Sequence, residues 1–210
     1  MPTEPSVKRT IAFFDGQNLF YAAKYAFGYL WPNYDPLKLA RKVCQVQGWQ
    51  LLSTRFYTGV PSPDDDRFWN HFWTAKLAQM GRVGVQAFSR HLKYRNQTVK
   101  LQGGQMVPVL VGSEKGIDVR LALDVVAAAW DSTCDVALIF SQDQDLSEVA
   151  DEVRAISVRQ NRWIKVACAF PVSPTYSNSR GIDRTDWVRI TRTTYDDCLD
   201  PRDYRPRRKP

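Results

Sequence analysis

The 210-residue sequence predicts an α/β fold in which helices cover both faces of a mostly parallel central sheet. Short apolar runs, which suit buried strands, alternate with helical stretches of about 10 to 15 residues. The composition, with 44% hydrophobic and 24% charged residues, is that of a globular protein and excludes a mainly disordered chain. No apolar run approaches the roughly 18 residues of a membrane span, and the N-terminus lacks a signal-peptide core, so we expect a cytoplasmic protein.

The first half of the chain is expected to hold three strands and three helices. The run Ile11–Phe14 ends at an Asp-Gly turn, and Asp35 followed by Pro36 is typical of a helix start. Asp64, Asp65 and Asp66 would complement the dipole of the third helix. The expected order is a strand at 11–14, helices at 18–27 and from 35, a strand at 49–57, a helix at 62–81 and a strand at 84–89.

A polar, basic segment follows and is expected to form a projecting β-hairpin. Residues 90–100 and 106–111 are two extended runs on either side of Gly103-Gly104, a pair that favours a tight turn. The pattern then returns to alternation, with helices expected at 116–130 and 146–160 and strands at 135–141 and 164–170; after residue 171 the pattern weakens and returns around 187–190. We expect one domain at residues 8–195 and a basic, flexible tail at 196–210.

Carboxylates follow two of the clearest strands. Asp15 and Asp143 come after apolar runs, neither begins an obvious helix, and Asp118 lies just inside the helix that precedes the later strand. Loops at the carboxyl ends of parallel strands meet at one edge of the sheet. Converging carboxylates repel one another unless a divalent cation or shared protons neutralise them. Mg²⁺ and Mn²⁺ favour such oxygen ligands, which points to metal-assisted phosphodiester hydrolysis.

Simpler interpretations of these acidic and amide residues stay open. Asp145 and Glu148 have the spacing of a capping box, and Asn18 could cap its own helix. Asp118 could instead serve the dipole of its helix. Asp124 lies six residues beyond Asp118, so the two point about 120° apart on a regular helix. Asp124 therefore either supports the site indirectly or is solvated.

Three sequence blocks, in this order, resemble the signature blocks of the NYN domain. NYN domains are the LabA-like members of the PIN-like nuclease superfamily. The blocks are FFDGQNLFYAAK, EKGIDVRLALDVV and DVALIFSQDQDLSEV, and GIDRTDWVRIT resembles the closing segment of the same group. The resemblance covers about residues 8–170. It implies a PIN-like three-layer α/β/α sandwich, an acidic site that depends on Mg²⁺ or Mn²⁺, and nuclease activity, often on RNA.

The resemblance also implies roles for individual residues. It implies metal ligands at Asp15, Asp118, Asp143 and Asp124, with Asn18 and Asp145 as further catalytic residues. Two positions of the third block depart from the family pattern. Gln142 replaces a small residue and Leu146 replaces a frequent Phe, so Gln142 is a position that could alter access to the metal.

Basic and aromatic side chains indicate where a nucleic acid would lie. The net charge is +7, and the last ten residues, with five basic side chains and one acid, contribute +4 of it, which leaves +3 for residues 1–200. We expect the hairpin to contact nucleic acid through basic side chains and one tyrosine, helped by Lys115 beside the site, although a merely solvated hairpin is the alternative. The hairpin candidates are Arg90, Lys93, Tyr94, Arg95 and Lys100.

The acidic residues and the family resemblance together predict a metal-dependent ribonuclease acting on single-stranded RNA, with RNA favoured over DNA as the substrate. The alternative is a nucleic-acid-binding or regulatory module that keeps the fold without catalysis. Phe68, Trp69, Phe72 and Trp73 have helical spacing and favour a core or an interface, which leaves a homodimer open. Tyr21 and Tyr25 lie one turn apart and would flank the cleft. The four cysteines are far apart in sequence and are expected to be buried thiols.

Overall fold

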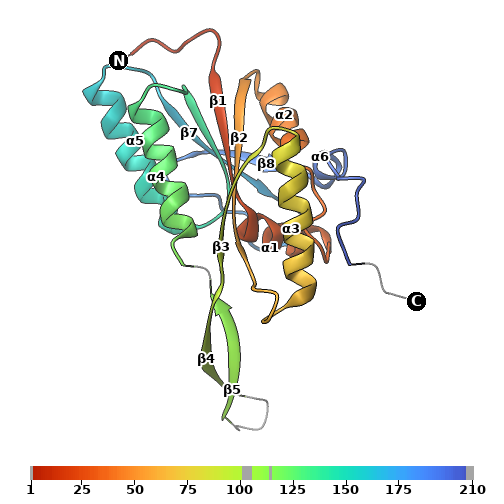
Figure 1. Ribbon diagram of the computed structural model, residues 1–210. Coiled ribbons are helices and arrows are strands. Elements are labelled where there is room, and N and C mark those ends of the chain that lie inside the picture. The colour runs from red at the N-terminus through yellow and green to blue at the C-terminus, as the bar shows by residue number, and fades with distance from the viewer. Residues whose placement is uncertain (1, 101–105, 114, 207–210) are drawn as a thin grey trace.

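The structure, a computed structural model, describes residues 2–100, 106–113 and 115–206. Its centre is a six-stranded sheet in the order β3-β2-β1-β6-β7-β8, in which every neighbouring pair is parallel. Helices α4 (Ile117–Trp130) and α5 (Ser147–Arg159) cover one face, and the remaining long helices cover the other (Figure 1). The predicted α/β class with a three-layer arrangement is confirmed.

The N-terminal half forms the elements in the predicted order. They are β1 (Arg9–Asp15), α1 (Gly16–Phe27), α2 (Pro36–Gln47), β2 (Gln50–Val60), α3 (Arg67–Arg82) and β3 (Gln86–His91). Aspartates start the three helices, because the side chains of Asp15, Asp35 and Asp66 accept hydrogen bonds from first-turn N–H groups. The expectation that α3 begins at residue 62 is wrong. Ser62 and Asp65 bond to each other in a separate turn, and Asp66 caps the helix.

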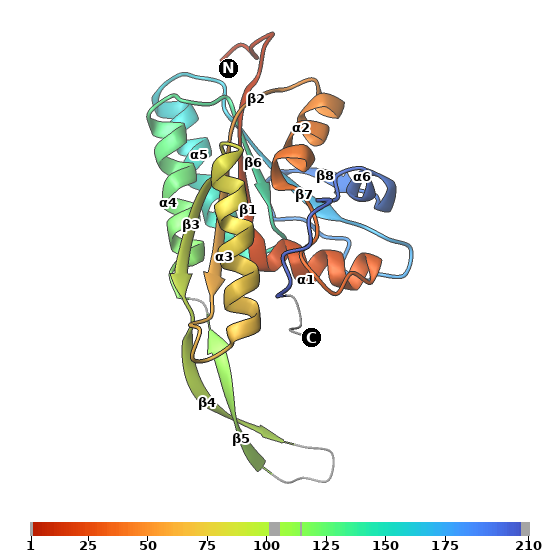
Figure 2. The ribbon, with the colours of Figure 1, turned by 45° about the vertical axis from the view of Figure 1, so that its right-hand side comes forward.

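The β-hairpin is confirmed and consists of β4 (Lys93–Lys100) and β5 (Met106–Ser113), paired antiparallel. The turn residues Gly103 and Gly104 lie outside the described residues. Because β4 follows directly from the end of β3, the hairpin projects from the edge of the sheet where β1, β2 and β3 all end (Figures 1 and 2).

The C-terminal half supplies the rest of the sheet. After α4 come β6 (Val136–Phe140), a single 3₁₀ turn (Gln144–Leu146), α5, β7 (Lys165–Pro171), β8 (Asp186–Ile190) and the short α6 (Arg192–Asp196). All five residues of β6 are buried, which explains why this strand is a continuous apolar run in the sequence.

Side chains that alternate along β1 serve two separate cores. Phe13 packs with the α4 and α5 side, whereas Phe14 packs on the α1, α2 and α3 side. The rings of Phe14 and Phe140 stack with centroids 3.9 Å apart, which fixes β1 against β6 in the middle of the sheet. All four cysteines are buried free thiols. None of the described helices is long and apolar enough to cross a membrane.

Packing continues beyond α6, into the stretch expected to be a flexible tail. Cys198 is buried in the core, and the ring of Tyr204 meets Phe72 edge-on at 6.0 Å. The buried ammonium of Lys76, on α3, lies 5.1 Å from the Tyr204 ring and 3.8 Å from the Asp200 carboxylate. Asp200 and Tyr204, in the segment after residue 195, therefore lie against α3.

Candidate metal centre

Three aspartates converge where β1 and β6 end. Asp15 is the last residue of β1, Asp143 follows β6, and Asp118 lies in the first turn of α4. One carboxylate oxygen from each lies within 4.8 Å of the other two. Strand pairing explains the meeting, because β1 and β6 are parallel neighbours whose carboxyl ends coincide at Phe14 and Phe140. The structure thus brings together three of the residues that the sequence analysis nominated as ligands.

Asp15 is the most enclosed of the three, with 4% of its surface exposed. Its carboxylate accepts hydrogen bonds from the Asn18 backbone N–H and from the Ser141 hydroxyl, both at 3.0 Å. Burial raises the pKa of Asp15 to about 7, opposed by these hydrogen bonds and helped by the negative charges of Asp118 and Asp143. The pKa of Asp118 is also raised, first by burial and then by its acidic neighbours. The cluster therefore holds more negative charge than its surroundings stabilise.

The loop after β6 is held by a short chain of hydrogen bonds. Asn18 Oδ1 accepts from the Gln142 backbone N–H at 2.8 Å, and Ser141 Oγ accepts from the Asp143 N–H at 3.1 Å. The Asp143 carboxylate accepts from the Asp145 N–H and caps the 3₁₀ turn. The idea that Asp15 and Asp143 begin no helix is therefore wrong, since each caps a helical segment and also faces the cluster.

The other two nominated acids lie outside this group. Asp145 is exposed, although its charge raises the pKa of Asp118. It does not cap α5, which begins at Ser147 without a side-chain cap, so the capping-box interpretation is wrong. Asp124 accepts a hydrogen bond from the Tyr57 hydroxyl at 2.7 Å and pairs with Arg120 at 3.0 Å. Asp124 thus has its own partners beside β2, as its angular offset from Asp118 on α4 predicts.

Comparison with known proteins decides the family. The sequence profile of the NYN domain matches residues 9–167, a range that contains all three clustered aspartates. The chain belongs to the NYN domain family. No curated protein matches the chain significantly.

Solved structures resemble this NYN domain at low sequence identity. A crystal structure of a protein of unknown function from Vibrio parahaemolyticus is 19% identical, with a TM-score of 0.53, over 94% of this chain and 99% of that one. This likeness supports the fold alone. MurG from Acinetobacter baumannii is 11% identical, with a TM-score of 0.33, over 87% of this chain and 45% of that one.

The two departures from the family pattern have structural partners in this NYN domain. Leu146 is buried in the core beside α5. The Gln142 side-chain amide donates to the carbonyls of Asn178 at 3.2 Å and Arg180 at 2.8 Å. Gln144 likewise bonds to Gly181 and Asp183. Gln142 and Gln144 therefore hold the 178–183 segment beside the loop after β6, a role with no recognisable signal in the sequence.

Basic side chains of the hairpin base lie on the same side of the NYN domain as the start of α4. The Arg90 guanidinium donates to the Lys115 carbonyl at 3.3 Å, and Lys115 and Lys93 are exposed. Gly116, between Lys115 and α4, has a φ of 72°, and a Cβ there would lie 2.5 Å from the Arg90 guanidinium. The side chains of Arg95 and Lys100, and residues 207–209 of the basic tail, lie outside the part of the chain that the structure describes.

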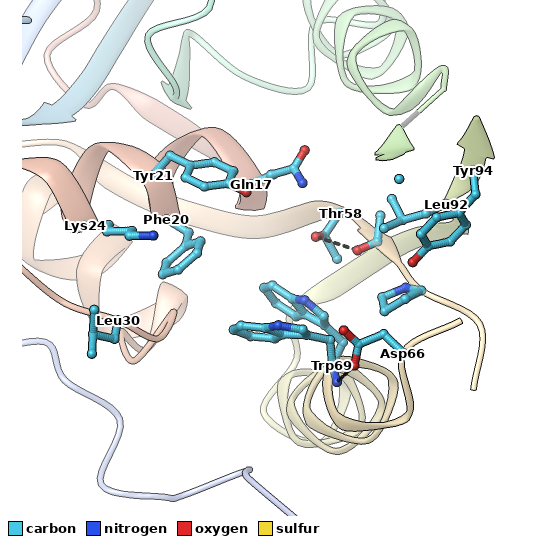
Figure 3. Close-up of a pocket in the computed structure, with 14 residues that line it drawn as sticks. Gln17, Phe20, Tyr21, Lys24, Leu30, Thr58, Asp66, Trp69, Leu92 and Tyr94 are labelled. Atoms are coloured by element: carbon cyan, nitrogen blue, oxygen red, sulfur yellow. Dashed lines mark hydrogen bonds between the residues drawn. The ribbon is translucent and has the colours of Figure 1, made fainter. Parts of the chain in front are cut away.

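A groove of about 390 Å³ lies next to α1 (Figure 3). Gln17, two residues after Asp15, lines it together with side chains from α1, the end of β2, α3 and the hairpin base. Tyr21 and Trp69 are among these side chains, and the largely buried Trp73 also lines the groove, whereas Phe72 is buried in the core away from it. The aromatic residues of α3 thus divide between the core, as predicted, and the wall of this groove.

Proposed function

We propose that this NYN domain is a metal-dependent ribonuclease that hydrolyses phosphodiester bonds of single-stranded RNA. The observation that carries the proposal is the convergence of Asp15, Asp118 and Asp143 within 4.8 Å. Three acids in one place, one of them buried and with its pKa raised to about 7, are a costly arrangement for a folded protein. A bound divalent cation would offset that cost, which makes the cluster a candidate functional site.

The donor set favours a hard cation. Among the described residues, the group contains carboxylates only, with neither histidine nor cysteine. Carboxylate oxygens suit Mg²⁺ and Mn²⁺, whereas Zn²⁺ sites usually contain nitrogen or sulfur ligands. When bound, such a cation supplies two things to phosphodiester hydrolysis, a lowered pKa for the attacking water and compensation of the charge on the phosphate.

The residues around the cluster would hold it in a working geometry. Ser141 donates to Asp15 and accepts from the Asp143 N–H, so one hydroxyl orients two of the three acids. Asn18 ties the loop after β6 to the start of α1. Side chains that hydrogen-bond to metal ligands fix the orientation of those ligands, and this raises the metal affinity and the activity of a site.

The surroundings of the cluster support a polyanionic substrate. Arg90 and Lys115 are exposed and adjacent to the first turn of α4, which carries Asp118. Lys93 continues this basic surface onto the hairpin. Basic side chains beside an acidic centre would draw phosphates towards the cation without occupying its position.

The test is cleavage of an end-labelled single-stranded RNA by wild type and Asp143→Asn in Mn²⁺ or Mg²⁺. We expect Asp143→Asn to lower the rate at least about 100-fold while the melting temperature stays within a few degrees of wild type. Asp131→Asn, which changes an exposed acid just after α4, is the matched control and should keep full activity.

Unchanged cleavage by Asp143→Asn, or cleavage that persists in excess chelator, would overturn the proposal. Salt-sensitive RNA binding by the wild type without any cleavage in either cation would support the other candidate, a nucleic-acid-binding module that keeps the acidic site. A gel-shift measurement on the same preparation separates these two outcomes.

A further inference from the structure

We propose that the groove between α1 and α3 binds unpaired nucleotides, with a base stacked on Tyr21 and a phosphate held by Lys24. The inference rests on the proposed function, because the role of the groove would be to lead single-stranded RNA to the proposed cation site. Figure 3 shows Phe20, Tyr21 and Lys24 projecting from α1, and Trp69 facing them from α3. At about 390 Å³, the groove has room for a nucleobase.

Aromatic rings run from the groove out over the surface of α1. The ring of Phe20 lies 6.3 Å from Trp69 and 5.3 Å from Tyr21. Tyr21, Tyr25 and Tyr176 then continue the row at centroid distances of 6.3 and 6.1 Å, with ring planes within 22° of parallel.

The exposure of this row is what points to a ligand. Tyr21 is 43% exposed and Tyr25 is 62% exposed, so their rings contribute little to the core. Contiguous exposed aromatic surface is typical of binding sites, and bases of any sequence stack on aromatic faces.

The groove offers one basic side chain to a phosphate. Lys24 lines the groove and makes no ion pair with any residue that the structure describes. The one acid in the lining, Asp66, is already engaged, because it accepts the Trp69 N–H as the cap of α3. An ammonium without a counter-ion next to stacked rings matches the alternation of phosphate and base along a single strand.

The groove and the carboxylates lie at the same edge of the sheet. Asp15 pairs in register with Tyr57, and the next residue of β2, Thr58, lines the groove. Gln17 lines it from the other side, two residues after Asp15 in the first turn of α1. A single-stranded nucleic acid bound in the groove would therefore continue towards the proposed cation site. A duplex keeps its bases stacked inside and cannot use this row of rings, so the substrate class is unpaired nucleic acid.

The test measures binding separately from cleavage. Fluorescence anisotropy with a labelled 12-nucleotide oligo-U, in chelator, gives the affinity of wild type, Tyr21→Ala, Tyr21→Phe and Lys24→Ala. We expect Tyr21→Ala to weaken binding roughly 5- to 100-fold and Tyr21→Phe to stay within about twofold, because phenylalanine keeps the stacking face. Lys24→Ala should lower the slope of log affinity against log salt by about 0.7, and Tyr21→Ala should leave that slope unchanged.

Two variants at sites away from the groove serve as controls. Trp130→Ala removes an exposed ring at the far end of α4, and Lys38→Ala removes an exposed lysine of α2. Both should bind as wild type does. Undiminished binding by Tyr21→Ala would overturn the inference. The inference would also be overturned if Tyr21→Ala lost as much affinity for an RNA duplex as for oligo-U, or if the wild type did not bind oligo-U.

The outcome for the groove is distinguishable from the outcome for the proposed function. If wild type cleaves RNA but Tyr21→Ala binds as tightly, the groove assignment is wrong and the nuclease stands. If Tyr21→Ala loses binding while the wild type cleaves nothing in Mg²⁺ or Mn²⁺, the groove stands and the nuclease is wrong.

Discussion

Asn18 and Gln142, 124 positions apart in sequence, are joined by a hydrogen bond in which the Asn18 side-chain oxygen accepts the Gln142 backbone N–H at 2.8 Å. This bond links the start of α1, next to Asp15, to the loop that carries Asp143. The mutual position of two candidate ligands therefore depends on one amide side chain that itself lies outside the group of three acids.

Replacing Asn18 by alanine should loosen the loop after β6 and weaken the metal site. We expect Asn18→Ala to reduce Mn²⁺ affinity and RNA cleavage by about 10- to 100-fold. Titration calorimetry with Mn²⁺ measures the affinity. Asn70→Ala is the matched control, because it removes an amide that donates to the Pro61 carbonyl in another part of the chain. A metal affinity that falls equally in both variants would contradict a specific role for Asn18.

The raised pKa of Asp15 makes the metal-free protein less stable as the pH rises. The folded state holds the Asp15 proton more tightly than the unfolded chain does, so stability is lost between the ordinary pKa of 3.8 and the folded value of about 7. At pH 8 and without metal, we expect Asp15→Asn to be more stable than wild type by roughly 1–3 kcal/mol. Urea denaturation at pH 5 and pH 8 measures this difference.

The same pair of proteins should differ in their response to a divalent cation. Mg²⁺ or Mn²⁺ should raise the melting temperature of the wild type and leave that of Asp15→Asn nearly unchanged, because binding to the folded state alone stabilises it. Asp131→Asn should behave as wild type in both measurements. Equal pH dependence in wild type and Asp15→Asn would show that Asp15 is not the titrating group.

Gly116 sets the entry to α4 and hence the position of Asp118. Gly116→Ala strains a backbone with a φ of 72° and displaces the Arg90 guanidinium. We expect a loss of about 1 kcal/mol in unfolding free energy and a weaker Mn²⁺ affinity. Gly48→Ala is the control, since its φ of 68° carries the same strain but a Cβ there meets nothing within 4 Å. It should lose the same stability and keep the metal affinity.

Lys76 should give the stability a second pH dependence, at alkaline pH. Burial lowers the pKa of Lys76 to about 8, opposed by the charge of Asp200, so the folded state disfavours the ammonium. Between about pH 8 and the ordinary pKa of 10.5, the unfolded chain keeps the Lys76 proton that the folded state has released. The free energy of unfolding therefore increases as the pH rises through this range. Between pH 8 and 10, wild type should gain about 1–2 kcal/mol relative to Lys76→Met in urea denaturation. A constant difference between the two proteins would exclude this assignment.

Most of the fold could be predicted because its strands are short, apolar and clearly bounded. Continuous burial of β6 produces the run from Val136 to Phe140, and the Asp35-Pro36 pair marks the start of α2 directly. The start of α3 could not be placed, because any of three consecutive aspartates can cap a helix. The choice of Asp66 depends on the separate turn between Ser62 and Asp65.

The part of the candidate site that could be predicted is the part that the order of the strands in the sheet determines. Asp15 and Asp143 meet because their strands are parallel neighbours, and Asp118 joins them from the α4 side. Asp124 was nominated through family resemblance alone, and its partner Tyr57 depends on a strand elsewhere in the sequence. Tyr21, which was expected beside a cleft, lines the groove, but its full outline could not be predicted, since Trp69 and Tyr94 reach it from segments with no local signal for such a meeting.

The central place of β1 has a consequence for how the protein is made. β1 pairs with β2 on one side and with β6 on the other, although about 120 residues separate β1 from β6 in sequence. During synthesis β2 is available first, so β1 and β2 can pair long before β6 leaves the ribosome. A nascent chain that has formed β1 without β6 brings only Asp15 to the site, and one edge of β1 stays unpaired until β6 has been synthesised. Cation binding by the proposed site would therefore be a late event of folding, and it would report that the two halves of the chain have joined.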